Sequence, residues 1–90
     1  MRVVVVGLGL IGGSVALAAR ERLGAEVYGT DADAETLQRA VVRGAVAAGD
    51  VPDADLVVVA APVGVLHTAI ESALARWPDA VITDVGSTKG

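Results

Sequence analysis

The chain has 90 residues, a formal net charge of −4 and no cysteine. That length allows at most one small domain, and the absence of cysteine excludes a disulfide scaffold and a cysteine zinc site. Apolar residues make up 53% and charged residues 20%, which excludes a disordered chain. The acidic balance argues against a nucleic-acid-binding protein, and no apolar run is long enough to cross a bilayer.

Small residues dominate the apolar fraction. Valine and alanine contribute 17 residues each, whereas the aromatic residues are one Trp and one Tyr. With 11 glycines in addition, the chain suits thin, closely packed layers. This composition favours strands covered by helices that present small side chains, as in α/β folds.

Strand and helix patterns alternate along the chain, since β-branched runs that stop at glycine or proline are followed by helix-forming runs. In chain order we predict a strand over residues 2–6, a helix over 14–22, a strand over 26–30, a helix over 34–43, strands over 45–48 and 56–60, a helix over 63–76 and a strand over 80–83. Gly24 and Gly44 are predicted to end the first two helices, and Asp31 or Asp33 to cap the second. The order implies a doubly wound parallel α/β sheet of the Rossmann type, with right-handed crossovers and strand order 3-2-1-4-5.

The first strand runs into a glycine-rich loop. The segment Gly7-Leu8-Gly9-Leu10-Ile11-Gly12 matches G-x-G-x-x-G between a predicted strand and a predicted helix, the context of a dinucleotide-binding loop. Gly7 allows the tight turn, Gly9 lets a diphosphate approach the backbone, and Gly12 allows close packing. The helix N-terminus offers free N–H groups to phosphates, so Gly7, Gly9, Leu10, Ile11 and Gly12 are the predicted cofactor-binding residues of this loop. The alternative is a glycine turn that serves packing alone.

Asp31 follows the second strand, where an acidic residue accepts hydrogen bonds from the adenosine ribose of a dinucleotide. Its charge would repel the 2′-phosphate of NADP, no Arg or Lys follows closely, and Asp33 adds negative charge. We therefore predict NAD as the cofactor. The alternative is that Asp31 only caps the next helix.

Two further segments follow strand ends at the same edge of the predicted sheet. The fourth strand is followed by Ala61, Pro62 and Val63. Small residues at this point leave room for the cofactor's ribose and adenine. The alternative is that the Ala-Pro sequence only ends the strand. The tail Asp84-Val85-Gly86-Ser87-Thr88-Lys89 comes after the last strand and carries the only lysine. Ser87 can donate and accept a hydrogen bond there; alternatively, Ser87 or Thr88 starts a helix.

Together, Gly7-Leu8-Gly9-Leu10-Ile11-Gly12-Gly13-Ser14 and Thr83-Asp84-Val85-Gly86-Ser87-Thr88-Lys89-Gly90 resemble the cofactor domain of prephenate and arogenate dehydrogenases of tyrosine biosynthesis. The resemblance covers all 90 residues but only the first part of such an enzyme. Residues 1–90 are accordingly expected to be the N-terminal part of a dinucleotide-binding domain, with no second domain.

The resemblance implies an oxidative decarboxylation, in which prephenate passes a hydride to NAD⁺, loses carbon dioxide and becomes 4-hydroxyphenylpyruvate. Ser87 matches a catalytic serine that hydrogen-bonds near the nicotinamide and helps to position a histidine. That histidine, the substrate-binding arginine and the helical dimerisation domain would lie after Gly90. The resemblance further implies a homodimer at full length, and it does not separate prephenate from arogenate. The expected location is cytoplasmic, with which the absence of cysteine is compatible.

The chain lacks the expected general base, so the isolated 90 residues should bind cofactor weakly or not at all and should not turn over. His67 falls within the third predicted helix and is interpreted as a surface residue, and no metal site is predicted. Val81 and Ile82 would leave an apolar sheet edge, which predicts self-association. Two alternatives stay open: a dehydrogenase of another small hydroxy acid or an imine reductase, and a non-catalytic NAD-binding module.

Overall fold

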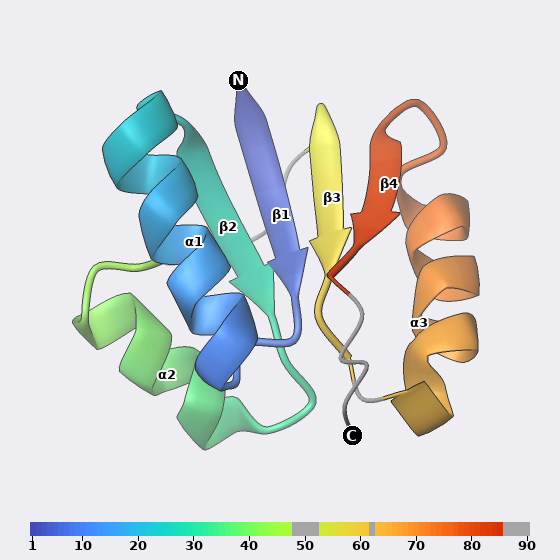
Figure 1. The fold of residues 1–90 in the computed structure, drawn as a ribbon, viewed down its shortest axis with the longest axis horizontal. Coiled ribbons are helices and arrows are strands. Elements are labelled where there is room, and N and C mark those ends of the chain that lie inside the picture. The colour runs from blue at the N-terminus through green and yellow to red at the C-terminus, as the bar shows by residue number, and fades with distance from the viewer. Residues whose placement is uncertain (48–52, 62, 86–90) are drawn as a thin grey trace.

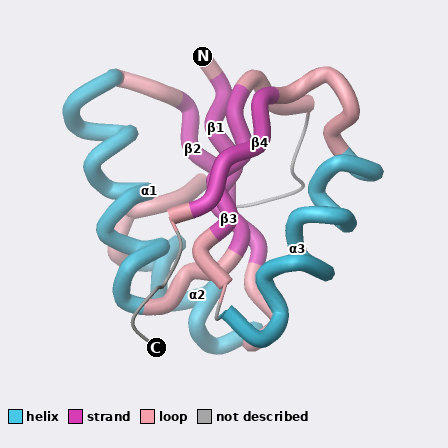
Figure 2. Tube along the Cα trace, turned by 45° about the vertical axis from the view of Figure 1, so that its right-hand side comes forward, coloured by secondary structure: helices cyan, strands magenta, loops and turns pink. Residues whose placement is uncertain are grey.

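The computed structural model describes residues 1–47, 53–61 and 63–85. Its strands are β1 (Arg2–Val6), β2 (Glu26–Thr30), β3 (Leu56–Val59) and β4 (Val81–Asp84). Its helices are α1 (Leu10–Leu23), α2 (Ala34–Val42) and α3 (Val63–Arg76). The four strands form one parallel sheet in the order β2-β1-β3-β4, with α1 and α2 on one face and α3 on the other (Figures 1 and 2). This confirms the predicted doubly wound α/β class.

The valines of β1 serve two separate layers, because successive side chains of a strand point to opposite faces. Val3 and Val5 belong to the cluster under α1 and α2, whereas Val4 belongs to the cluster under α3. The first cluster includes Ala16 and Ala19 of α1, and its small side chains let that helix lie close to the sheet. The run of valines in β1 is therefore buried on both faces, as its sequence predicts.

Helix α1 begins at Leu10, four residues before the predicted start at Ser14. Gly9 is its N-cap, so the helix runs through Gly12 and Gly13. Glycine lowers helix propensity by about 1 kcal/mol relative to alanine, which is why the prediction began after these residues. The close packing of Gly12 against the carbonyl of Gly7 overrides that preference here. The end at Gly24 is confirmed, with a left-handed backbone at φ 63°.

The strand predicted over residues 45–48 does not form in residues 45–47, and residue 48 lies outside the described residues. Ala45 and Val46 form a buried bend in the core under α1 and α2. Ala47 then donates its N–H to the carbonyl of Val27 at 2.8 Å, which sets the chain beside the outer edge of β2. The other four strands have the relative order that was predicted.

Candidate functional site

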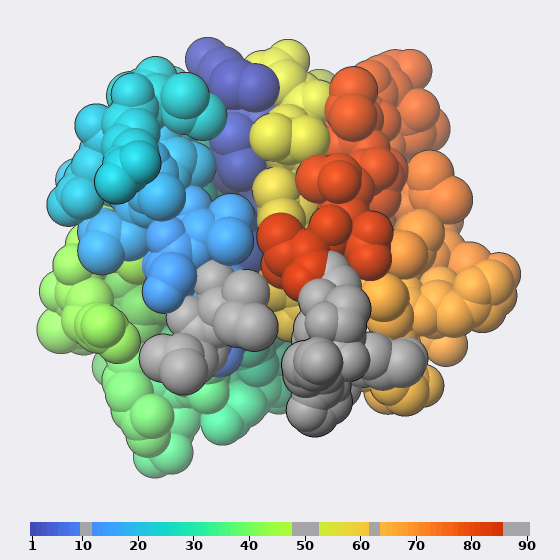
Figure 3. Space-filling model, viewed as in Figure 1, coloured from blue at the N-terminus to red at the C-terminus, as the bar shows by residue number. Residues whose placement is uncertain are grey.

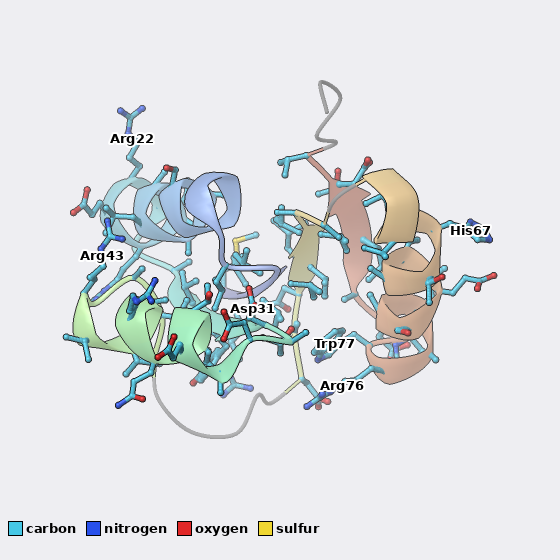
Figure 4. All side chains as sticks on the ribbon, turned by 90° about the horizontal axis from the view of Figure 1, so that it is seen from below. Arg22, Asp31, Arg43, His67, Arg76 and Trp77 are labelled. Carbon is cyan, nitrogen blue, oxygen red and sulfur yellow. The ribbon has the colours of Figure 1, made fainter. Side chains whose placement is uncertain are left out.

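The carboxyl ends of all four strands meet at one edge of the sheet, because the strands are parallel. Figure 4 looks onto this edge, where Asp31 lies between the α1–α2 layer and the α3 layer. The glycine loop leaves β1 here, and Ala60 and Ala61 follow β3 here. In open α/β sheets this is the edge at which ligands bind.

The glycine loop is closely packed at its two ends and open in the middle. Gly7 has φ 93°, and a Cβ at this position would lie 2.7 Å from the carbonyl oxygen of Ala60. At Gly12 a Cβ would lie 1.7 Å from the carbonyl oxygen of Gly7, so α1 approaches the end of β1 too closely for any side chain. Both positions thus require glycine for the fold itself.

Gly9 differs from these two glycines. A Cβ built on it would have no atom of the described residues within 4 Å, and its φ of −69° is one that any residue adopts. Packing among the described residues therefore gives no reason for glycine here. The space beside Gly9 adjoins the N-terminus of α1, whose first N–H groups have no partner within the helix. An anionic group could approach the backbone at this point.

Asp31 is half-buried and holds two backbone N–H groups. Its Oδ2 accepts a hydrogen bond from Leu8 in the glycine loop at 2.6 Å, and its Oδ1 accepts one from Asp33 at 2.8 Å. Asp33 caps α2 instead: its carboxylate accepts hydrogen bonds from the Glu35 N–H at 3.1 Å and from the Thr36 hydroxyl at 3.0 Å. The reading of Asp31 as only a helix cap is therefore wrong.

Some of the remaining predicted site residues lie within the described part of the chain, and others lie outside it. Leu10 and Ile11 form the first turn of α1, and Val63 is the first residue of α3. Ala61 is buried in the cluster under α3. Pro62 and the tail with Ser87 and Lys89 lie outside the described residues. Val85, just before that tail, donates its N–H to the carbonyl of Val59 at 3.1 Å, so Val85 itself lies at the same strand edge.

His67 lies away from this edge. Its side chain is 88% exposed on the outer side of α3 and pairs with Glu71 at 3.3 Å, one helical turn on (Figure 4). The surface position predicted for it is confirmed. In the part of the chain that the structure describes, no three His, Asp or Glu side chains are grouped so as to hold a metal ion.

Two features of this edge were not predicted. Leu8 is buried against β2, where a Cβ on Gly29 would lie 2.6 Å from Leu8 Cδ1. A lone glycine within a strand is a known sign of such a close approach and could have indicated it. The second feature is a cavity of about 330 Å³ between α1 and α2, which brings Arg39 and Arg43 to the same space as Gly9. Its lining residues are Leu8, Gly9, Gly13, Ser14, Leu17, Thr36, Arg39, Ala40, Arg43 and Ala45.

The amino-terminal edge of the sheet carries charge pairing of another kind. Arg2 Nε lies 3.1 Å from Glu26 Oε1, and this hydrogen bond raises the pKa of the exposed Arg2 guanidinium above its ordinary value. The Arg2 backbone N–H is also held by Asp55 at 2.8 Å. These contacts join β1, β2 and the start of β3 at the end of the sheet opposite the candidate site.

None of the three described helices could cross a bilayer, the longest having 14 residues. A comparison with curated protein sequences gives no match.

Solved structures give strong matches. Arogenate dehydrogenase from Synechocystis matches with a TM-score of 0.86 and 31% identity, over 97% of this chain and 33% of that one. Prephenate dehydrogenase from Aquifex aeolicus, in complex with hydroxyphenyl propionate and NAD⁺, matches with a TM-score of 0.85 and 29% identity, over 100% of this chain and 35% of that one. A second structure of the Aquifex aeolicus enzyme matches with a TM-score of 0.83 and 30% identity, over 98% and 35% of the two chains.

The chain thus spans about a third of the length of the solved structures that it matches. The sequence profile of the family described as "Prephenate dehydrogenase, nucleotide-binding domain" matches residues 15–90. The chain belongs to this family.

Proposed function

We propose that the carboxyl edge of the sheet is an NAD site, with the diphosphate over Gly9 and the adenosine ribose at Asp31. The observation that carries this proposal is the open backbone at Gly9: nothing in the described structure occupies the place of a side chain there. The same edge provides a helix N-terminus for the phosphates and a carboxylate for the ribose hydroxyls. NAD bound to the relative from Aquifex aeolicus supports this choice of cofactor.

The described residues fit such a cofactor. When bound, NAD supplies an acceptor for a hydride. The chain's own part would be to bind and orient: Gly7 and Gly12 shape the loop, Leu10 and Ile11 provide backbone N–H groups, and Ala61, Pro62 and Val63 would border the adenosine. Ser87 would lie near the nicotinamide. Residues 1–90 would form the N-terminal part of the family's nucleotide-binding domain.

The site can be tested by titrating the chain with NAD and following backbone amide signals by NMR, which detects weak binding. We expect shifts at Gly7, Gly9, Gly12 and Asp31. Gly9→Asn should lower the affinity by roughly tenfold or more, because its side chain fills the open space and takes helix N–H groups. Asparagine is a good N-cap, so the free energy of unfolding should change by less than about 1 kcal/mol. His67→Ala is the control with unchanged binding; shifts confined to α3 would contradict the proposal.

For the longer protein that carries this domain, we propose the oxidative decarboxylation of prephenate or arogenate with NAD. The family and the two relatives support this substrate class. The 90 residues should not catalyse it alone, because their only histidine is exposed on the outer side of α3, away from Asp31. Incubation of the purified chain with NAD⁺ and either substrate should yield no NADH. Steady NADH formation would contradict the proposed inactivity.

Two further features of the protein are its oligomeric state and its cellular location. We propose that the longer protein is a cytoplasmic homodimer and that the 90 residues alone self-associate through β4. Val81 of that edge strand is exposed, and an edge strand of this kind pairs readily with another chain. Size-exclusion chromatography should show an apparent mass above 9.0 kDa that falls in the Val81→Lys variant. A monomeric parent chain would exclude self-association.

A further inference from the structure

Leu8 lies between the first two glycines of the loop. Its side chain packs on β2, and its backbone N–H is bound by the residue that follows β2. Its side chain is 5% exposed and lies over Gly29, where a Cβ would come within 2.6 Å of it. Its backbone N–H donates to Asp31 Oδ2 at 2.6 Å. The preceding N–H, that of Gly7, donates to the carbonyl of Thr30 at 2.8 Å. Two successive residues of the loop are therefore fixed to the end of β2.

The carboxylate of Asp31 is the central part of this attachment. One oxygen holds Leu8, which lies 23 residues earlier in the chain, and the other holds Asp33, two residues later. Hydrogen bonds to an ionised acceptor are stronger than those between neutral groups. Since both oxygens have backbone partners, the carboxylate has a fixed orientation before any ligand arrives.

We infer that Asp31 is a positioning residue as well as a ribose ligand: it fixes the glycine loop through Leu8 in the ligand-free protein. The ribose contact rests on the proposed function, whereas the attachment of the loop does not. A carboxylate offers about four acceptor positions, and the two N–H groups leave room for ribose hydroxyls. The loop that receives the diphosphate and the carboxylate that receives the ribose therefore form one preorganised unit, which lowers the cost of ordering on binding.

Amide hydrogen exchange of the ligand-free chain, measured by NMR, tests this inference. In Asp31→Ala the Leu8 amide should exchange roughly ten- to a hundred-fold faster, the factor that corresponds to one hydrogen bond to a charged group. In Asp31→Asn at least one of the two N–H groups should also exchange faster, because an amide has one acceptor oxygen. Asp33→Asn is the matched control: it makes the same chemical change two residues on, keeps a good N-cap, and should leave Leu8 unchanged.

Slow exchange at Val4 and Val58 shows that each variant is folded. If Leu8 exchanges at the parent rate in a folded Asp31→Ala variant, or if Leu8 and Asp33 both do so in a folded Asp31→Asn variant, the inference is wrong. Gly29→Ala provides an independent variant that keeps the carboxylate and crowds the Leu8 side chain instead. It should also speed exchange at Leu8, whereas Gly64→Ala, an exposed helical glycine with no atom near its Cβ, should not. An unchanged Leu8 in Gly29→Ala would show that the Asp31 carboxylate holds the loop without help from the packing of the Leu8 side chain.

The two proposals fail in distinguishable ways. If NAD shifts amides of α3 and none of the loop but Leu8 still depends on Asp31, the NAD site is wrong and the loop attachment stands. If NAD shifts the loop but Leu8 exchange does not depend on Asp31, the positioning role is wrong and the NAD site stands.

Discussion

The two halves of the sheet differ in what covers them. Val3 of β1, Leu56 of β3 and Val81 of β4 lie in register on the same face. Val3 is 1% exposed beneath the α1–α2 layer, whereas Val81 is 66% exposed. Figure 3 shows the cause: α1 covers the β2–β1 half of this face, and parts of β3 and β4 lie open between α1 and α3. An apolar β-branched residue thus forms a strand in both halves, but its burial depends on whether a helix crosses it.

The largest effect should follow from a change at the closest contact in the covered half. Gly12→Ala places a Cβ 1.7 Å from the carbonyl oxygen of Gly7. Because this oxygen belongs to the backbone, the clash can be relieved only by a shift of the loop or of α1. We expect a loss of about 3 kcal/mol or more in the free energy of unfolding, measured by urea denaturation. Gly64→Ala on exposed α3 is the control and should be neutral or slightly stabilising. Equal stabilities for the two variants would show that α1 does not approach β1 this closely.

A smaller effect should separate the two halves directly. Val3→Ala removes two buried methyl groups and should cost about 2 kcal/mol of unfolding free energy. Val81→Ala makes the same chemical change on the same face and should cost less than about 0.5 kcal/mol, since its side chain is already in solvent. Parallel urea titrations at low protein concentration provide the comparison. Similar losses in both variants would mean that Val81 is covered in solution.

The smallest effect concerns the entry to α2, which belongs to the covered half. Asp33→Ala removes the side chain that caps this helix and should cost about 1 kcal/mol. Asp33→Asn loses the charge but keeps a capping oxygen, so its stability should stay close to that of the parent chain. Thermal unfolding followed by circular dichroism would rank the three proteins. If alanine and asparagine destabilise equally, the charge of Asp33 matters and the cap does not.

Most of the fold follows from local patterns. Strands β1 and β2 and helix α3 have the predicted bounds. Gly7 follows β1, and Pro62 and Pro78 flank the run of α3, whereas β2 lies between Gly24 and Asp31 and contains Gly29. The start of α1 was predicted too late because Gly12 and Gly13 disfavour helix locally. Only the close approach of the Gly7 carbonyl, a contact between two elements, explains why a helix with glycine is retained there.

The candidate site was predictable to a similar extent. The motif spacing predicted that the glycine loop and Asp31 would share the carboxyl edge of the sheet, and the structure brings them together. It did not predict that Asp31 already holds the Leu8 N–H, nor that Gly29 makes room for the Leu8 side chain. Those contacts join residues more than 20 positions apart, and nothing in the local pattern specifies them.

The distribution of aromatic residues has a spectroscopic consequence. Trp77 lies buried in the cluster under α3 with the Arg76 guanidinium 4.9 Å from its ring centre, and Tyr28 packs against the same cluster. These are the only aromatic residues of the chain, so both natural fluorophores report on one face of the sheet. The intrinsic fluorescence would change when α3 loosens, whereas a loosening of the layer of α1 and α2 alone would leave it unchanged. A tryptophan introduced on α2 would give that second layer its own signal, so the two faces could be followed independently during unfolding.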